Sequence, residues 1–255
     1  MTGGARAGDF DYERHGHGYP SQRRTDPRIA QAIEAALGDA RTVLNVGAGA
    51  GSYEPEDRHV LAVEPSPTMR AQRPSHLAPA IDAVAEALPF DDRSVDAAMA
   101  VLSVHQWPDV ETGLGELRRV ARGPVVILTF DPEAIVRFWL ADYVPELVEL
   151  ESRRVPSIET IRRELGSRTE VRVVPVPADC RDGFTEAFYG RPEKFLQDEV
   201  RASQSVWGFV ESEVEARFVR ELRADLSSWA WDERYGVLRS LPAYEGALRL
   251  VAGHP

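Results

Sequence analysis

A glycine-rich turn directly after a short apolar run constrains the fold more than any other feature of this sequence. The apolar run covers residues 42–46 (TVLNV), and the chain continues as Gly-Ala-Gly-Ala-Gly over residues 47–51. Glycines permit a sharp turn and let a ligand approach the backbone without a Cβ in the way. The pattern predicts a buried strand that ends at a ligand-binding loop; a tight strand-to-helix turn without a ligand is the alternative.

Short apolar runs and amphipathic stretches alternate along the rest of the chain. The expected strands are residues 42–46, 60–63, 80–85, 95–101, 125–130, 171–176 and 248–251. Helical spacing of apolar residues predicts helices after the Asp26-Pro27 cap, over residues 110–121 and after Ser157. This alternation predicts an α/β fold, a Rossmann-like, doubly wound, seven-stranded and mostly parallel sheet.

The segment before the last expected strand breaks this alternation. Residues 178–243 are rich in aromatic side chains, and Val214, Phe218 and Leu222 recur at helical spacing. So much apolar surface would not stay solvated, so we expect a helical insertion packed on the sheet.

Charge and cysteine content exclude several classes of function. The net charge is −11 and the isoelectric point is about 5.1, which argues against a nucleic-acid partner. Cys180 is the only cysteine and is interpreted as a small buried filler, so no disulfide within the chain and no thiolate-rich metal site can form. His15 and His17 supply only half of a metal site, so no metal is expected.

Hydropathy predicts a cytoplasmic protein without a membrane partner. No apolar run reaches the roughly 20 residues that a membrane helix needs. The first residues lack the apolar region of a signal peptide. The prevalence of arginine over lysine, with many alanines, is typical of a GC-rich bacterium.

An acidic residue at the end of the second expected strand narrows the range of possible ligands. Glu64 stands where a ribose lies in such folds, and a carboxylate there accepts hydrogen bonds from two hydroxyls. NAD and S-adenosylmethionine both carry that ribose. The glycines read G-x-G-x-G, whereas the dinucleotide fingerprint reads G-x-G-x-x-G. The spacing therefore favours a loop that cradles an amino-acid moiety over one that binds a pyrophosphate.

Four segments in order resemble the class I S-adenosylmethionine-dependent methyltransferases. The nearest pattern is the small-molecule branch related to quinone-biosynthesis methyltransferases. The matching segments are residues 43–53 (VLNVGAGAGSY), 63–69 (VEPSPTM), 85–96 (AEALPF followed by SVD) and 103–107 (SVHQW). The resemblance implies S-adenosylmethionine as the cofactor and covers about residues 26–132.

The same resemblance implies a set of cofactor-binding residues. From the matching motifs these are Gly47, Ala48, Gly49, Gly51, Glu64, Pro65, Met69, Ala85, Glu86, Leu102 and Ser103. Glu64 would hold the ribose hydroxyls, and Leu102 and Ser103 would back the sulfonium. Many relatives have Asp where Val84 stands here. The adenine would then rest on backbone contacts at Ala85 or on Glu86.

Further residues, two of them within the fourth segment, complete the expected site. His105 is the candidate general base, because it follows the fourth strand at the ligand edge of the sheet; a packing role is the alternative. Trp107 is either a substrate wall or a core aromatic. Arg23 and Arg24 would pair the carboxylate of the methionine moiety unless they form a solvated basic turn. Tyr12 and Tyr19 would belong to a lid over the cofactor, with a flexible tail as the alternative.

Together these features predict a single domain with a small-molecule methyl acceptor. Residues 1–25 form the lid or tail, residues 26–132 the cofactor-binding half and residues 133–255 the substrate-side half. The expected reaction is O- or N-methylation of a metabolite by a monomer or homodimer. The alternatives are a nicotinamide-dependent oxidoreductase and a non-catalytic regulatory subunit that binds S-adenosylmethionine.

Overall fold

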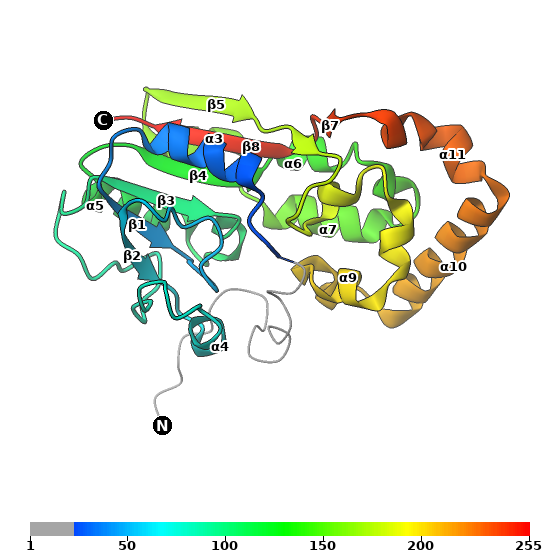
Figure 1. Ribbon diagram of the computed structural model, residues 1–255, viewed down its shortest axis with the longest axis horizontal. Coiled ribbons are helices and arrows are strands. Elements are labelled where there is room, and N and C mark those ends of the chain that lie inside the picture. The colour runs from blue at the N-terminus through cyan, green and yellow to red at the C-terminus, as the bar shows by residue number, and fades with distance from the viewer. Residues whose placement is uncertain (1–22) are drawn as a thin grey trace.

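A computed structural model describes residues 23–255, which form a sheet with helices on both faces and a helical lobe beside it (Figure 1). Tyr12, Tyr19, His15 and His17 lie outside the described residues. The predictions of a lid and of a half metal site at these positions therefore remain predictions.

The central sheet has six strands in the order β2-β1-β3-β4-β8-β5. Its strands are β1 (Thr42–Val46), β2 (His59–Val63), β3 (Ala97–Val101), β4 (Val125–Phe130), β5 (Thr169–Val173) and β8 (Leu248–Gly253). The first four run parallel, and β8 runs antiparallel to both of its neighbours. The α/β, Rossmann-like and mostly parallel sheet predicted from the sequence is thus confirmed.

Of the seven predicted strands, the one over residues 80–85 does not form within the described residues. Residues 80–85 contribute a single parallel bridge from Ile81 to Val63 at the outer edge of β2. Ile81 donates to the carbonyl of Ala62 and accepts from the amide of Glu64. Ile81 is 41% exposed and Asp82 is exposed, so little apolar burial favours a longer strand here.

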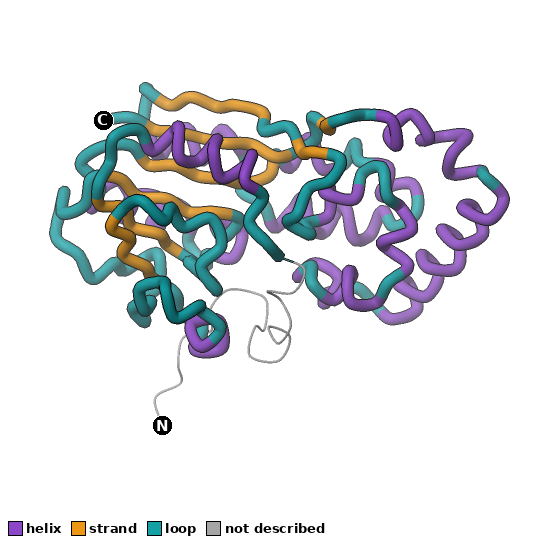
Figure 2. Tube along the Cα trace, viewed as in Figure 1, coloured by secondary structure: helices purple, strands orange, loops and turns teal. Residues whose placement is uncertain are grey.

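Helices cover both faces of the sheet, as a doubly wound fold requires (Figures 1 and 2). Before the insertion they are α3 (Pro27–Leu37), α4 (Pro67–Ala71), η1 (Val104–Gln106), α5 (Val110–Val120), α6 (Pro132–Ile135), η2 (Trp139–Asp142), α7 (Pro145–Arg154) and α8 (Ile158–Leu165), where η marks a 3-10 helix. Asp26 caps α3 through the amide of Arg28, and Ser157 caps α8 through the amide of Thr160.

Two apolar cores flank the sheet because successive residues of a strand face opposite sides. In β1, Val43 joins the core under α3, whereas Leu44 joins the core under α5 and α8. In β4, Val126 joins the core under α3, and Ile127 joins the core under α5 and α8. The sheet is therefore held from both sides, and its carboxyl edge stays open for a site.

The insertion before β8 is helical and aromatic, as predicted, and forms the lobe that carries α9, α10 and α11 in Figure 1. The predicted strand over residues 171–176 ends as β5 at Val173, and Val176 begins β6 (Val176–Pro177), which pairs with β7 (Ala243–Tyr244) in a separate sheet. The helices between them are η3 (Thr185–Phe188), η4 (Pro192–Leu196), α9 (Asp198–Ala202), η5 (Ser205–Phe209), α10 (Ser212–Ser228), α11 (Ala230–Tyr235) and η6 (Gly236–Ser240). Trp139 packs edge-to-face against Trp231 and Phe195, with ring centroids 5.5 Å and 5.7 Å apart. These contacts join the lobe to the segment that follows β4.

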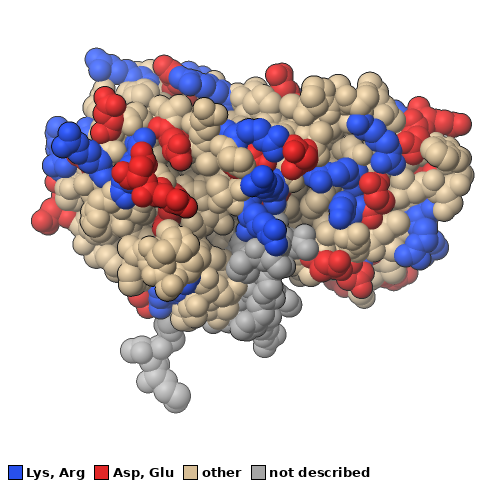
Figure 3. All heavy atoms as spheres, viewed as in Figure 1, with Lys and Arg blue, Asp and Glu red and all other residues tan. Residues whose placement is uncertain are grey.

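Two observations concern the helices and the surface of the described residues. None of the helices within residues 23–255 is long and apolar enough to cross a membrane. On the face seen in Figure 3, arginines and acids are interspersed over the surface. That face offers no extended basic stripe for a nucleic-acid backbone.

Candidate functional site

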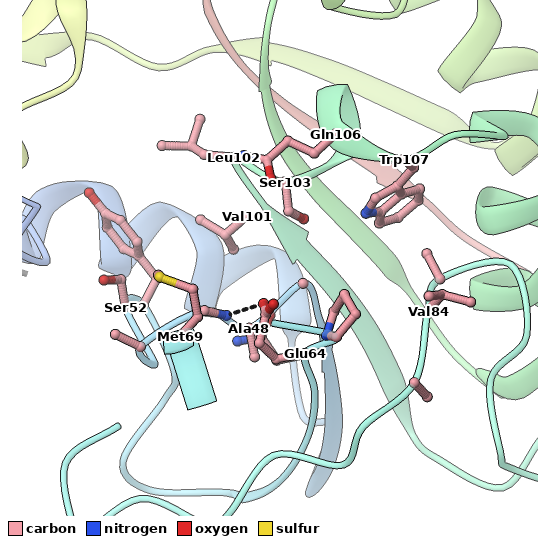
Figure 4. Close-up of a pocket in the computed structure, with 18 of the residues that line it drawn as sticks. Ala48, Ser52, Glu64, Met69, Val84, Val101, Leu102, Ser103, Gln106 and Trp107 are labelled. Carbon is pink, nitrogen blue, oxygen red and sulfur yellow. Dashed lines mark hydrogen bonds between the residues drawn. The ribbon is translucent and has the colours of Figure 1, made fainter. Parts of the chain in front are cut away.

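A pocket of about 290 Å³ opens where the parallel strands β1, β2 and β3 end, beside the glycine loop (Figure 4). Ligands of open α/β sheets bind at this edge. The pocket is lined by Arg23, Asn45, Gly47, Ala48, Gly49, Ala50, Ser52, Tyr53, Glu64, Pro65, Met69, Ala83, Val84, Ala85, Glu86, Val101, Leu102, Ser103, Gln106, Trp107, Pro108 and Asp182. The structure thus brings together most of the residues selected from the sequence.

The glycine loop approaches the end of β3 too closely for a side chain at its first position. Gly47 has a φ of 69°, and a Cβ there would lie 2.6 Å from the Cβ of Ser103. The Ser103 hydroxyl donates to the carbonyl of Val46 at 3.0 Å and so joins the ends of β1 and β3. Gly47 is therefore required by both its φ and this close approach.

Protein acceptors already bind most of the amides of this loop. The amides of Gly47 and Ala48 both donate to the carbonyl of Val63, and the amide of Gly51 donates to the carbonyl of Ala48. The amide of Gly49 donates to Glu64. A pyrophosphate is bound by a row of outward-pointing amides, so this loop does not suit a dinucleotide.

Glu64 lies at the centre of the pocket, between the loop and the start of α4. Its Oε2 accepts from the amide of Gly49 and its Oε1 from the amide of Ser66, each at 2.8 Å. The side chain is 7% exposed, and burial raises the pKa of the carboxyl while the two amides oppose that rise. A carboxylate has about four lone-pair sites, so two remain for ligand hydroxyls.

Asn45 also lines the pocket and carries an unsatisfied acceptor. Its Nδ2 donates to Oε1 of Glu54 at 3.0 Å, which fixes the orientation of the amide. Within residues 23–255, its Oδ1 is buried without a hydrogen-bond partner. Such an orphaned oxygen carries a free-energy cost unless a ligand donates to it. The sequence analysis did not select Asn45, although it follows the apolar residues Val43 and Leu44 of β1 in the segment that resembles the family.

Val84 and Trp107 form one end of the pocket, opposite Ser52 and Met69 (Figure 4). Trp107 lies over α5 so closely that a Cβ on Gly113 would come within 2.6 Å of its ring. Trp107 therefore serves both as a pocket wall and as a packed aromatic. Oε1 of Glu86 accepts from the amide of Asp109 at 3.1 Å, so part of this carboxylate is already engaged.

Some of the cofactor-binding residues predicted from the sequence do not line this pocket. Gly51 has a φ of 97° and no room for a Cβ, which would lie 2.2 Å from Cδ1 of Leu77, so it shapes the loop without lining the pocket. Arg24 is exposed, and its neighbour Arg23 faces the pocket instead. Successive residues of an extended segment point to opposite sides. Tyr19 is outside the described residues.

His105 lies in η1 and borders a second, smaller cavity rather than the main pocket. That cavity shares Arg23, Leu102 and Gln106 with the main pocket. Nε2 of His105 is 3.4 Å from Nε2 of Gln106. His105 is thus one residue away from the pocket wall, on the side toward the insertion.

A buried polar network that the sequence analysis did not predict closes the pocket on the side of Tyr53. Asp182 accepts from Nε of Arg23 at 2.5 Å and from the Tyr53 hydroxyl at 2.9 Å. Asp26 accepts from the amide of Arg181 at 3.1 Å. The segment before α3, the end of the glycine loop and the start of the insertion are thereby tied together.

Two further features concern the ionisable side chains of the described residues. Within residues 23–255, no group of three or more His, Cys, Asp or Glu side chains could hold a metal ion. Cys180 is buried, and burial raises the pKa of its thiol to about 12, so it is a poor nucleophile.

Comparisons with known proteins agree with this geometry. The model of a methyltransferase domain family matches residues 44–127. A solved structure from Anabaena variabilis, described as a "Putative methyltransferase from antibiotic biosynthesis pathway", is 31% identical with a TM-score of 0.83. The match covers 91% of this chain and 98% of that one. This chain belongs to the class I S-adenosylmethionine-dependent methyltransferases.

Other relatives of this methyltransferase are more distant. A malonyl-[acyl-carrier protein] O-methyltransferase of Halorhodospira halophila is 29% identical over 143 residues, which are 51% of this chain and 48% of that protein. An uncharacterized methyltransferase of Mycobacterium tuberculosis is 35% identical over 119 residues, 44% of each chain. The chain thus spans about half the length of the curated relatives it matches.

Structural likeness extends beyond these relatives at the level of the fold. A geranyl diphosphate C-methyltransferase of Streptomyces coelicolor, solved with S-adenosyl-L-homocysteine, is 15% identical with a TM-score of 0.50. That match covers 89% of this chain and 78% of the other. The cofactor predicted from the sequence is the cofactor of this family.

Proposed function

We propose that this methyltransferase transfers the methyl group of S-adenosylmethionine to an oxygen or nitrogen atom of a small metabolite. The observation that carries the proposal is the pairing of Glu64 and Asn45 in one pocket. Glu64 keeps lone pairs for two ribose hydroxyls. The orphaned Oδ1 of Asn45 would accept from the ammonium of the methionine moiety.

The pocket residues fit the cofactor in shape as well as in polarity. Gly47 lets the loop lie directly against Ser103, which sets the position of the pocket wall. Val84, Ala85 and Trp107 provide a mostly apolar end for the adenine. Because Oε1 of Glu86 is engaged by Asp109, we propose that backbone groups near Ala85 contact the adenine edge.

Leu102 separates the cofactor pocket from the cavity beside His105. It directly follows β3 with a φ of 51°, and its amide donates to the carbonyl of Leu128 at 2.8 Å. Such a backbone conformation is uncommon for leucine and costs free energy, so tertiary contacts must hold it. Held in this way, Leu102 fixes the point at which cofactor and acceptor meet.

When bound, S-adenosylmethionine supplies an electrophilic methyl group on a sulfonium. The residues around it orient the acceptor, and well-oriented reactions gain several kcal/mol from proximity. His105 would accept the acceptor's proton, a contribution of typically 10²–10⁴-fold where that proton leaves in the transition state. Because Asp182 already pairs Arg23, we propose that Arg23 orders this wall of the pocket rather than binding the methionine carboxylate.

The proposal also covers the domain organisation, the cellular location and the assembly of the protein. We propose one domain with a cofactor-binding half over residues 26–132, a substrate-side half over residues 133–255 and a lid over residues 1–25. The proposed location is cytoplasmic, and the proposed assembly is a monomer or homodimer. The O-methyltransferase name of the Halorhodospira halophila relative supports oxygen as one of the two acceptor atoms.

Methyl transfer can be tested with labelled S-adenosylmethionine and a panel of small metabolites that carry hydroxyl or amino groups. We expect label in at least one small product and formation of S-adenosylhomocysteine that depends on that metabolite. Binding of S-adenosylhomocysteine without transfer to any member of the panel would favour the regulatory-subunit alternative. Loss of both binding and transfer would contradict the proposed function.

A further inference from the structure

We propose that the cavity beside His105 is the acceptor site, and that it selects a compact, uncharged molecule with an apolar body and one hydroxyl or amino group. The inference rests on the proposed function, because it assigns the second substrate of the same site. In the described chain the cavity is bordered by Arg23, Leu102, His105, Gln106, Phe130, Glu151, Phe184, Thr185, Gln204, Ser205 and Val206.

The position of this cavity places an acceptor next to the transferable methyl group. Arg23, Leu102 and Gln106 border both the cavity and the cofactor pocket. Leu102 and Gln106 lie across the pocket from Glu64 (Figure 4). An acceptor in the cavity therefore approaches the cofactor over Leu102, from the side of the insertion.

The inner wall of the cavity is apolar. The rings of Phe130 and Phe184 lie against each other, with centroids 5.6 Å apart and a tilt of 57°. Beyond Phe130, Glu151 and Thr185 lies a further small cavity, lined mainly by apolar side chains of the segment after β4. Those side chains are Ile135, Phe138, Leu140, Leu147 and Val148. An apolar acceptor body gains free energy by covering this wall.

The charges around the cavity are already paired. Nε of Arg23 lies 2.5 Å from Oδ1 of Asp182, whose side chain is 2% exposed. Nη1 of Arg154 lies 3.3 Å from Oε2 of Glu151. An anionic acceptor would have to compete with one of these pairs or lose its hydration without a counter-ion, and both cost free energy. Within residues 23–255 there is also no metal-binding cluster that could hold a diphosphate through a cation.

Neutral polar groups border the cavity. The Thr185 hydroxyl donates to Oε1 of Gln204 at 2.8 Å, and Nε2 of Gln204 donates to the carbonyl of Val200 at 3.3 Å, so both side chains are held in place. Nε2 of Gln106 lies 3.4 Å from Nε2 of His105. A single hydroxyl or amino group fits such a set of amides, hydroxyls and imidazole.

The two cavities limit the size of the acceptor. Their volumes are about 40 Å³ and about 30 Å³. An engineered cavity of about 150 Å³ holds benzene, so even one ring needs the shared wall of Phe130, Glu151 and Thr185 to move. A second fused ring would require a still larger displacement of that wall.

The transfer step is balanced without a further reactant. A lone pair of the acceptor's oxygen or nitrogen forms the new bond to the methyl carbon. The bond from sulfur to that carbon breaks, and its electron pair stays on sulfur as the neutral thioether of S-adenosylhomocysteine. The proton on the acceptor atom passes to His105, or to water.

Two matched probes test this assignment by binding to the protein saturated with S-adenosylhomocysteine. The probes are 4-methylphenol, which is neutral, and 4-hydroxybenzoate, which has a similar size but carries a carboxylate. Ligand-observed NMR should show binding of 4-methylphenol and at least tenfold weaker binding of 4-hydroxybenzoate. Equal or stronger binding of 4-hydroxybenzoate, or no binding of either probe, would overturn the proposed acceptor class.

Substitutions at the cavity test whether 4-methylphenol binds there. Ser205 borders the cavity, and Ser205→Phe should fill it and reduce 4-methylphenol binding at least tenfold. Ser240→Phe is the matched control, because Ser240 lies at the exposed end of η6, outside both cavities. It should leave binding of 4-methylphenol unchanged. If Ser205→Phe does not fold, Thr185→Val removes a cavity hydroxyl and should weaken 4-methylphenol several-fold.

Calorimetry with S-adenosylhomocysteine separates the two proposals. Unchanged cofactor affinity in Ser205→Phe together with lost probe binding supports the acceptor site. Unchanged cofactor affinity together with unchanged probe binding contradicts the acceptor site alone. Failure of the wild-type protein to bind S-adenosylhomocysteine contradicts the proposed function itself.

Discussion

Replacing Glu64 by alanine removes the group that the structure places at the centre of the cofactor pocket. Two lone-pair sites of its carboxylate are bound by the amides of Gly49 and Ser66, and two remain for the ribose. Hydrogen bonds to a charged group are worth about 1.5–3 kcal/mol. Glu64→Ala should therefore weaken binding of S-adenosylhomocysteine roughly tenfold to a hundredfold, as measured by titration calorimetry.

The same substitution also leaves two amides without their acceptor, so its effect on the fold must be measured separately. Thermal unfolding without ligand reports that effect, and Glu64→Asp keeps the charge if Glu64→Ala does not fold. Glu56→Ala is the matched control, because Glu56 is exposed close to the loop in sequence and outside the pocket. Wild-type affinity in Glu64→Ala would show that the ribose binds elsewhere and refute this reasoning.

Three further changes test other parts of the account. His105→Ala should lower kcat by about 10²–10⁴-fold for a hydroxyl acceptor while cofactor affinity stays the same; an unchanged kcat would remove His105 from the reaction. Burial raises the pKa of Glu186 from 4.5 to about 7, so its stabilising contribution is present below about pH 4.5 and is lost as the pH rises through 7. Urea unfolding should show the wild type losing about 3 kcal/mol of stability relative to Glu186→Gln over that interval; parallel profiles would contradict the raised pKa. Tyr53→Phe deletes the buried hydrogen bond to Asp182 and should cost about 1–2 kcal/mol of unfolding free energy, and an unchanged urea midpoint would show that this bond adds nothing.

Features encoded by neighbouring residues could be predicted from the sequence. The helix after Asp26 begins at Pro27 and ends at Leu37, because the cap, the apolar spacing and Gly38 all lie within one short stretch. The strands β1 and β4 occupy the predicted residues for the same reason. The placement of Glu64 beside the glycine loop follows from the parallel order of β1 and β2.

Features that depend on distant contacts could not be predicted in this way. Asp182 acts through Arg23 and Tyr53, which are 159 and 129 residues away in the chain. The orphaned oxygen of Asn45 is visible only once Glu54 has fixed the amide. The local sequence around Ile81 predicts a strand, but in the structure this segment makes only a single bridge to the edge of β2.

The glycine loop and Glu64 should bind S-adenosylmethionine rather than a dinucleotide. Calorimetric titration of the wild-type protein with S-adenosylhomocysteine and, separately, with NADH distinguishes the two ligands. We expect saturable, micromolar binding of S-adenosylhomocysteine and no binding of NADH, because protein acceptors already bind the amides of Gly47, Ala48, Gly49 and Gly51. Binding of NADH with no heat from S-adenosylhomocysteine would show that the loop is a dinucleotide site.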